Sequence, residues 1–259
     1  GTGGIVSIGV SLPKALVSGP TLAEVDGNVS AASALNVTAS SSNDAESHPH
    51  AFSLGIFSGS GTNADAEVTS GAGTLAQVTG GTQHVSGLTQ LQAVSGNVAN
   101  ADITSTSLSG VTVSIQKPTA LVGGPTTAEY DGSLTGGSLT VQSLGWNRAT
   151  SEVDVVAVSL LGGGQGSFAE ADISPSARIL AKVGGATIST SGAITVDAET
   201  ANIVASVVTP QKDTATATAK AIGGSILFNA NSMGAQSDIE GGVVAEEDGN
   251  ILGSGSVAV

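Results

Sequence analysis

The 259-residue sequence contains no cysteine. Disulfides, thiolate metal sites and cysteine nucleophiles are therefore excluded. Aromatic residues make up only 2% of the chain and charged residues 11%, whereas charged residues are about 25% of an ordinary globular domain. A layered domain built around a core of Phe, Leu and Trp is therefore not expected.

Basic residues are also scarce. Lys and Arg number 7 against 21 Asp and Glu, which gives a net charge of −14. Because nucleic-acid binding needs clustered Lys and Arg, nucleic acid is excluded as a partner. No apolar run approaches the roughly 18 residues of a membrane-spanning segment, and no basic segment precedes an apolar run at Gly1, so we expect neither a membrane span nor a targeting segment. Neither end of the sequence carries a recognisable boundary signal, and we expect the chain to be part of a longer protein.

The sequence is repetitive. The segment from Pro13 to Gly27 recurs from Pro118 to Gly132 with most positions identical, and Ala23-Glu24-Val25-Asp26-Gly27-Asn28 returns near the end from Ala245 to Asn250. Shorter runs around 35–37, 91–93, 139–141 and 194–196 indicate a half-repeat. The sequence therefore predicts repeats of about 105 residues with half-repeats of about 52. We expect one continuous segment over 1–259, with units near 5–109 and 110–222 and a partial unit over 223–259.

The local period within each unit is two, which is typical of β-strands. A helical pattern is absent. The apolar residues of the alternating runs are expected to face the interior; they are Val6, Ile8, Val10, Leu12, Phe52, Leu54, Ile56, Val111, Val113, Ile115, Val156, Val158 and Leu160. Short repeated strands with small interior residues predict an all-β parallel β-helix, or β-solenoid, in which each coil buries its apolar side chains against its neighbours.

The coil length is open at this point. Coils of roughly 20–26 residues would give on the order of ten to thirteen levels, and each half-repeat would then be two coils or one wider coil. The Gly-rich segments 58–61 and 162–166 predict either a protruding hairpin or a tight corner.

A resemblance follows from these units. Each has a strand, a Pro-containing segment, the Ala-Glu-x-Asp-Gly turn, a Gly-rich bend and a Leu-Thr-Val run. In this order of segments the chain resembles the repeats of bacterial filamentous-haemagglutinin and leukotoxin-type filamentous adhesins. The resemblance implies a right-handed parallel β-helix located outside the cell, at a bacterial surface.

Carboxylates alternate with small residues in two equivalent segments. Asp65 and Glu67 lie in one, and Glu170 and Asp172 in the other. If the half-repeats stack in register, these outward carboxylates form acidic ladders that a calcium ion could bridge. The alternative is a solvated acidic face that prevents lateral aggregation.

Two other patterns have structural alternatives. Asp26-Gly27, Asp131-Gly132 and Asp248-Gly249 are predicted to be tight turns rather than cation ligands. His48 and His50, with Asp44 and Glu46, are predicted to form an exposed loop rather than a divalent metal site.

Catalytic motifs are missing, and we expect no enzyme. A polysaccharide lyase or hydrolase with Glu152 and Asp154 as acid and base is one alternative. An ice-binding face around the Thr residues of 214–218 is another.

These observations together predict a structural β-solenoid that forms a rod, stalk or filament at the bacterial cell surface, with end-to-end association of copies. A module that binds host or cell-surface glycan or protein is the alternative function. No cofactor other than calcium is expected.

Overall fold

The computed structural model describes residues 2–185, 187–204 and 207–259. Within this part of the chain every regular element is a strand, and none of it forms a helix that could cross a membrane. The smaller sheet has five strands, which are β3 (Thr21–Val25), β7 (Thr74–Val78), β9 (Thr126–Tyr130), β11 (Ile179–Val183) and β17 (Val243–Glu247). The larger sheet comprises β1 (Thr2–Ser11), β2 (Lys14–Val17), β4 (Val29–Ala32), β5 (Leu35–Ser47), β6 (His50–Val68), β8 (Thr82–Val122), β10 (Ser133–Ile173), β12 (Thr187–Thr190), β13 (Ala193–Val204), β14 (Val207–Pro210), β15 (Thr214–Ser225), β16 (Phe228–Ile239), β18 (Asn250–Gly253) and β19 (Ser256–Ala258).

The strands stack in parallel into five levels. Thr2 pairs with Ser53, Ser53 with Ser107, Ser107 with Ala157 and Ala157 with Gly223, so successive coils contain 51, 54, 50 and 66 residues. The predicted parallel β-solenoid is therefore confirmed, and each half-repeat is one wide coil. The shorter coil of 20–26 residues is wrong, because residues that pair between successive levels lie at least 50 positions apart in the sequence.

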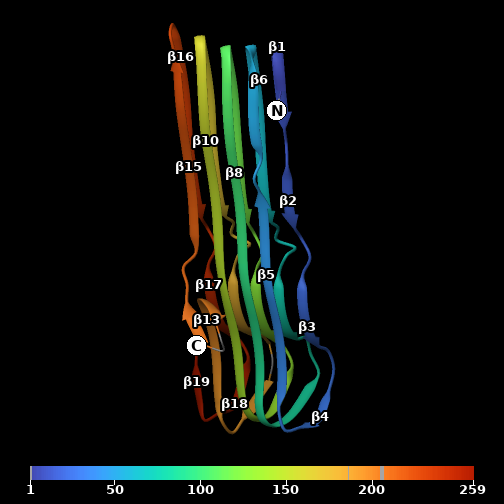
Figure 1. Cartoon of the computed structure of the whole chain (residues 1–259). Coiled ribbons are helices and arrows are strands. Elements are labelled where there is room, and N and C mark those ends of the chain that lie inside the picture. The colour runs from blue at the N-terminus through green and yellow to red at the C-terminus, as the bar shows by residue number, and fades with distance from the viewer. Residues whose placement is uncertain (1, 186, 205–206) are drawn as a thin grey trace.

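Each coil is long across the solenoid axis and thin along it (Figure 1). The chain descends through β1, β2 and β3, turns at β4 and ascends through β5 into β6. From Leu35 to Ile56 the ascending layer spans about 70 Å at about 3.3 Å per residue, whereas five levels occupy only about 20 Å along the axis. The molecule is thus a flat stack of elongated coils.

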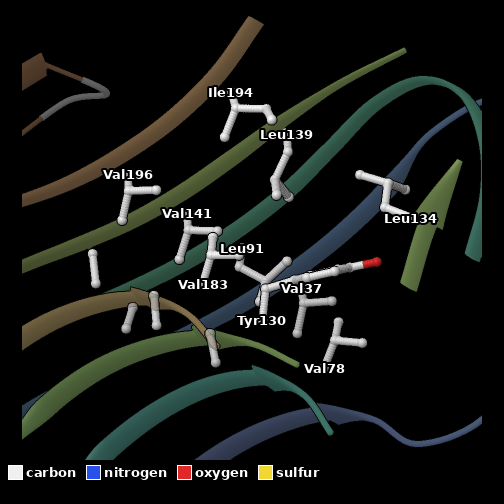
Figure 2. Close-up of a cluster of buried hydrophobic side chains, with 14 of the residues drawn as sticks. Val37, Val78, Leu91, Tyr130, Leu134, Leu139, Val141, Val183, Ile194 and Val196 are labelled. Atoms are coloured by element: carbon white, nitrogen blue, oxygen red, sulfur yellow. The ribbon is translucent and has the colours of Figure 1, made fainter. Parts of the chain in front are cut away.

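The lower end of the coils holds the aliphatic core. Columns of Val, Leu and Ile from successive coils fill the space between the two layers, as Figure 2 shows around Leu91, Leu139 and Ile194. Tyr130 is fully buried among them, and its hydroxyl donates a 2.7 Å hydrogen bond to Gln83 Oε1. Burial raises the pKa of Tyr130 well above its usual range, so its neutral form occupies the core.

The middle of the coils has a narrower core made mostly of alanine. Ala66, Ala99, Ala101, Ala120 and Ala171 are at most 1% exposed. Small side chains let the ascending and descending layers approach each other, and this explains why the sequence has few large apolar residues to place inside.

The polarity reverses at the end of the coils opposite β4. We call this region the tip and define it as residues 4–12, 51–63, 104–116, 155–168 and 222–234. Apart from Val155 and Ala157, its buried side chains are polar, and they include Ser53, Ser58, Thr62, Ser105, Ser107, Thr112, Ser114, Gln116 and Gln165.

Most apolar side chains of the tip face outward. Their assignment to the interior was wrong for Val6, Ile8, Val10, Leu12, Phe52, Leu54, Ile56, Val113, Ile115, Val156, Val158 and Leu160, all of which are exposed. Alternation with period two identifies two faces of a strand, but it does not say which face is inside, and at the tip the Ser and Thr face is inside.

The corners follow the predicted turn chemistry. All three Asp-Gly pairs lie where a strand of the smaller sheet ends and the chain bends toward the next strand of the larger one. Gly27 has a φ of 118°, a conformation that favours glycine. The Gly-rich segments 58–61 and 162–166 form the descending side of the tip corner.

A matched pair on β10 tests the assignment of faces. Val153 is 0% exposed in the alanine-rich core, and Val156 is 40% exposed on the outside. Val153→Asp should lower the free energy of unfolding by roughly 4 kcal/mol or more, because it buries an unpaired charge. Val156→Asp should cost less than about 1 kcal/mol. Denaturant unfolding measures both, and equal losses would contradict the orientation of β10.

Candidate functional site

The four carboxylates predicted to bind calcium lie on the descending layer and point outward. Asp65 and Glu67 are on β6, and Glu170 and Asp172 are on β10. The coil between them places Thr119 beside Asp65 and Glu170, and it places Leu121 beside Glu67 and Asp172. The two acidic pairs are therefore two coils apart, about 9.6 Å at 4.8 Å per coil, and no continuous acidic ladder forms.

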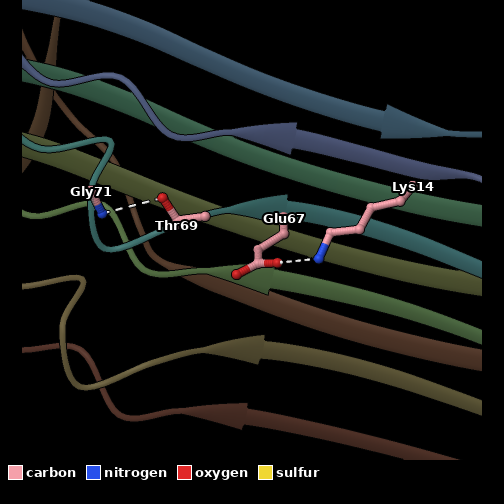
Figure 3. A network of polar contacts seen from close by, with 4 residues as sticks. All are labelled: Lys14, Glu67, Thr69 and Gly71. Atoms are coloured by element: carbon pink, nitrogen blue, oxygen red, sulfur yellow. Dashed lines mark hydrogen bonds and ion pairs between the residues drawn. The ribbon is translucent and has the colours of Figure 1, made fainter.

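Lysine neutralises one member of each pair. Lys14 Nζ donates to Glu67 Oε2 at 2.9 Å (Figure 3), and Lys117 Nζ lies 3.4 Å from Glu170 Oε2. The hydrogen bond to Glu67 raises the pKa of Lys14. Beside this pair the Gly71 amide donates to Thr69 Oγ1 at 3.2 Å and closes the turn after β6.

Asp172 differs from the other three carboxylates. Burial raises its pKa, and the nearby Glu240, Asp238 and Glu170 raise it further. Asp238 is the residue paired with Asp172 on the next coil. Over the described ranges no three Asp, Glu or His side chains gather into a group that could hold a metal ion. Calcium binding at Asp65, Glu67, Glu170 and Asp172 stays a prediction for each pair separately.

The remaining acidic and histidine candidates lie on the ascending layer. Lys220 Nζ is 2.5 Å from Glu152 Oε1 and 3.9 Å from Asp154 Oδ1, so both carboxylates face one ammonium group. His48 Nε2 is 3.7 Å from Glu46 Oε2. The Thr residues of 214–218 stand beside Arg148, Thr150 and Glu152, which is not a flat threonine array.

An asparagine ladder inside the coils was not predicted. Asn43 Nδ2 donates to Asn97 Oδ1 at 2.8 Å, and Asn97 Nδ2 donates to Asn147 Oδ1 at 2.9 Å. Each amide also donates to a backbone carbonyl on the descending side, namely that of Ala72, Gly124 or Ala177. The ladder thus ties the two layers together between the alanine-rich core and the aliphatic core. Its sequence signal was Asn at intervals of one coil, 43, 97 and 147.

Asp213 ends the ladder. Its Oδ1 accepts a 2.8 Å hydrogen bond from the backbone N–H of Asn147, and its Oδ2 accepts one from the side-chain Nδ2 of Asn147 at 3.2 Å. Asn202, one full repeat of 105 residues after Asn97, does not continue the ladder: it lies in the antiparallel pair β13 and β14, which lengthens the fourth coil. Burial raises the pKa of Asp213, although the two hydrogen bonds from Asn147 oppose the shift.

Asp213→Asn tests the effect of this buried charge. A folded-state pKa above the unfolded value means that the carboxylate costs stability as pH rises through the ordinary aspartate range near 4 to the raised folded value. The variant should therefore melt at a higher temperature than the parent at neutral pH, and the difference should disappear on acidification below pH 4. A higher melting temperature for the parent at pH 7 would show that the charge is favourable there.

A hollow on the ascending layer contains the only tryptophan. It has a volume of about 510 Å³ and lies between the coil face and β13. The Trp146 ring covers Gly96 of the preceding coil, since a side chain there would collide with it, and the Arg148 guanidinium lies 6.0 Å from the ring centroid. Polar side chains form most of the remaining wall, and they are Thr38, Ser40, Ser41, Ser42, Gln92 and Asn202.

Comparison with known proteins gives no relative: no family model, no curated protein and no solved structure matches the chain.

Proposed function

We propose that the chain is a structural segment of a repetitive extracellular surface protein, in which coils stack into a long ribbon and copies associate end to end. The observation that carries this proposal is that the two end coils have unpaired strand edges. The strands of the first coil, β1 to β5, pair with a neighbour on one side only, and those of the last, β15 to β19, likewise.

The two ends carry the same column of side chains. Ala23, Ala76, Ala128, Ala181 and Ala245 form one column through all five levels. A second copy could continue this column by placing its Ala23 on Ala245. The same contact would cover partly buried residues, among them Val25 and Leu35 at one end and Ile251 at the other. Free parallel edges with matching side chains favour strand addition.

The repeat texture supports an extracellular location, because it resembles filamentous adhesins of bacterial surfaces. A chain without cysteine and with few charged residues suits export in an unfolded form. Holding another part of a surface protein away from the cell is the mechanical role that a stack of identical coils serves best.

A substitution at one coil end tests end-to-end association. Leu35→Lys places a charge at the open side of the first coil, and it should shorten the filaments seen by electron microscopy over a concentration series while leaving the melting temperature within a few degrees. Val156→Lys, on the lateral face of a middle coil, is the control and should leave filament length unchanged. Isolated single stacks at every concentration, or shortening by the control alone, would count against the proposal.

A second candidate function rests on the hollow around Trp146. An aromatic ring beside hydroxyl and amide groups is the combination that binds sugars, because the ring packs on C–H faces while polar groups bond hydroxyls. We propose glycan binding there as the alternative role of this segment.

Glycan-array binding tests this alternative. Trp146→Ala should reduce the signal for any bound glycan at least tenfold, since the apolar contact is lost. Phe168→Ala removes an aromatic ring far from the hollow and should leave binding intact. An array without any signal for the parent chain, or equal losses for the two variants, would rule out this site.

A further inference from the structure

The outer surface of the tip carries many large apolar side chains. All four phenylalanines and the single methionine of the chain lie in it, and each is at least 40% exposed; they are Phe52, Phe57, Phe168, Phe228 and Met233. Apart from Tyr130, the buried cores elsewhere are built from Ala, Val, Leu and Ile. Large exposed apolar patches mark surfaces that bind an apolar partner.

Three sides of the tip are apolar. Leu54, Leu108 and Val158 face outward from the ascending layer, and Val113 and Ile115 face outward from the descending layer. At the edge between the layers a groove of about 520 Å³ is lined by Leu54, Ile56, Leu108, Leu160 and Leu161. A protein that docked on one layer would leave the opposite layer exposed. A fluid apolar medium would contact all three sides.

The interior of the tip suits such a medium. Ser58 and Thr112 are joined at 3.0 Å, Ser60 and Ser114 at 2.8 Å, and Gln116 Nε2 donates to Ser105 at 3.2 Å. Strands in contact with lipid show this polarity, with polar side chains inside and apolar side chains outside. In the middle coils most of the tip backbone is paired with a coil on either side, as hydrocarbon surroundings require, although the ladder skips Ile56, Gly110 and Leu160–Leu161 at the corner itself.

Charged pairs surround the base of the tip, which itself contains no Asp, Glu, Lys or Arg. Lys14 with Glu67 and Lys117 with Glu170 stand on the descending layer, and Lys220 with Glu152 stands on the ascending layer. Neighbouring charges of both signs complement a zwitterionic headgroup.

The height of the tip fits one leaflet. From His50 to Ile56 the strand rises about 20 Å at about 3.3 Å per residue, whereas half of a typical hydrocarbon core is about 15 Å. The tip is therefore long enough to enter one leaflet and too short to cross both.

We infer that the tip inserts into the surface of a bilayer of zwitterionic lipid and holds the stack of coils edge-on to that surface. This interaction goes beyond the structural role proposed above, because it assigns the ribbon a lateral partner along every coil. Insertion depends on apolar contact, and the net charge of −14 opposes binding to anionic lipid.

Flotation with phosphatidylcholine vesicles tests this inference. The parent chain should float with the vesicles, and the double variant Leu108→Asp/Val113→Asp should show a partition coefficient at least tenfold lower, because each Asp would have to enter hydrocarbon. Leu22→Asp is the matched control: Leu22 is 53% exposed and Leu108 52%, but Leu22 lies on β3, far from the tip. The control should float like the parent.

A second readout locates the tip in the bilayer. With Trp146→Phe as background, Phe57→Trp should shift its fluorescence to the blue on addition of vesicles and be quenched by brominated acyl chains, whereas Leu22→Trp should not respond. A parent chain that fails to float would overturn the inference. So would a dimer in sedimentation analysis that the double variant abolishes while vesicles have no effect, because a second copy would then cover the tip.

Discussion

In-register stacking of wide parallel coils is the constraint on which the rest of the structure depends. Backbone hydrogen bonds run along the solenoid axis, so each position in a coil lies about 4.8 Å from the equivalent position in the next. The residue type at each position is therefore determined mainly by the equivalent residues of the neighbouring coils, which together form a column. Alanine columns, the asparagine ladder and the polar interior of the tip are three results of this one rule.

The columns also explain why glycine and large rings occur together. The Trp146 ring lies over Gly96, the Phe228 ring over Gly162 and the Phe168 ring over Gly234, each across a coil boundary. A Cβ at any of these glycines would collide with the ring. A ring and a glycine in neighbouring coils thus share the space of two ordinary side chains, and an aromatic residue fits a stack that otherwise accepts small ones.

Much of the fold could be predicted because the repeat of Pro13–Gly27 and the period of two are properties of the strands themselves. The face of each strand could not. Over residues 112–122 of β8 the even-numbered positions face inside throughout, but the apolar residues change from odd-numbered positions such as Val113 and Ile115, which are outside, to even-numbered ones such as Ala120, which are inside. The arrangement of the candidate calcium-binding carboxylates could not be predicted either. The spacing of Asp65 and Glu170 is two coils, so the intervening Thr119 was invisible to an alignment of full repeats.

The elongated outline of the coil gives any stack of them a mechanical direction. Resistance to bending grows as the cube of the depth of a beam, and a coil about 70 Å wide consists of two sheets only about 10 Å apart. A ribbon of such coils is therefore compliant across its flat faces and stiff in the plane of its width. It would follow a curved surface that it met with a flat face, but it would stand as a rigid fin on a surface that it met with its edge.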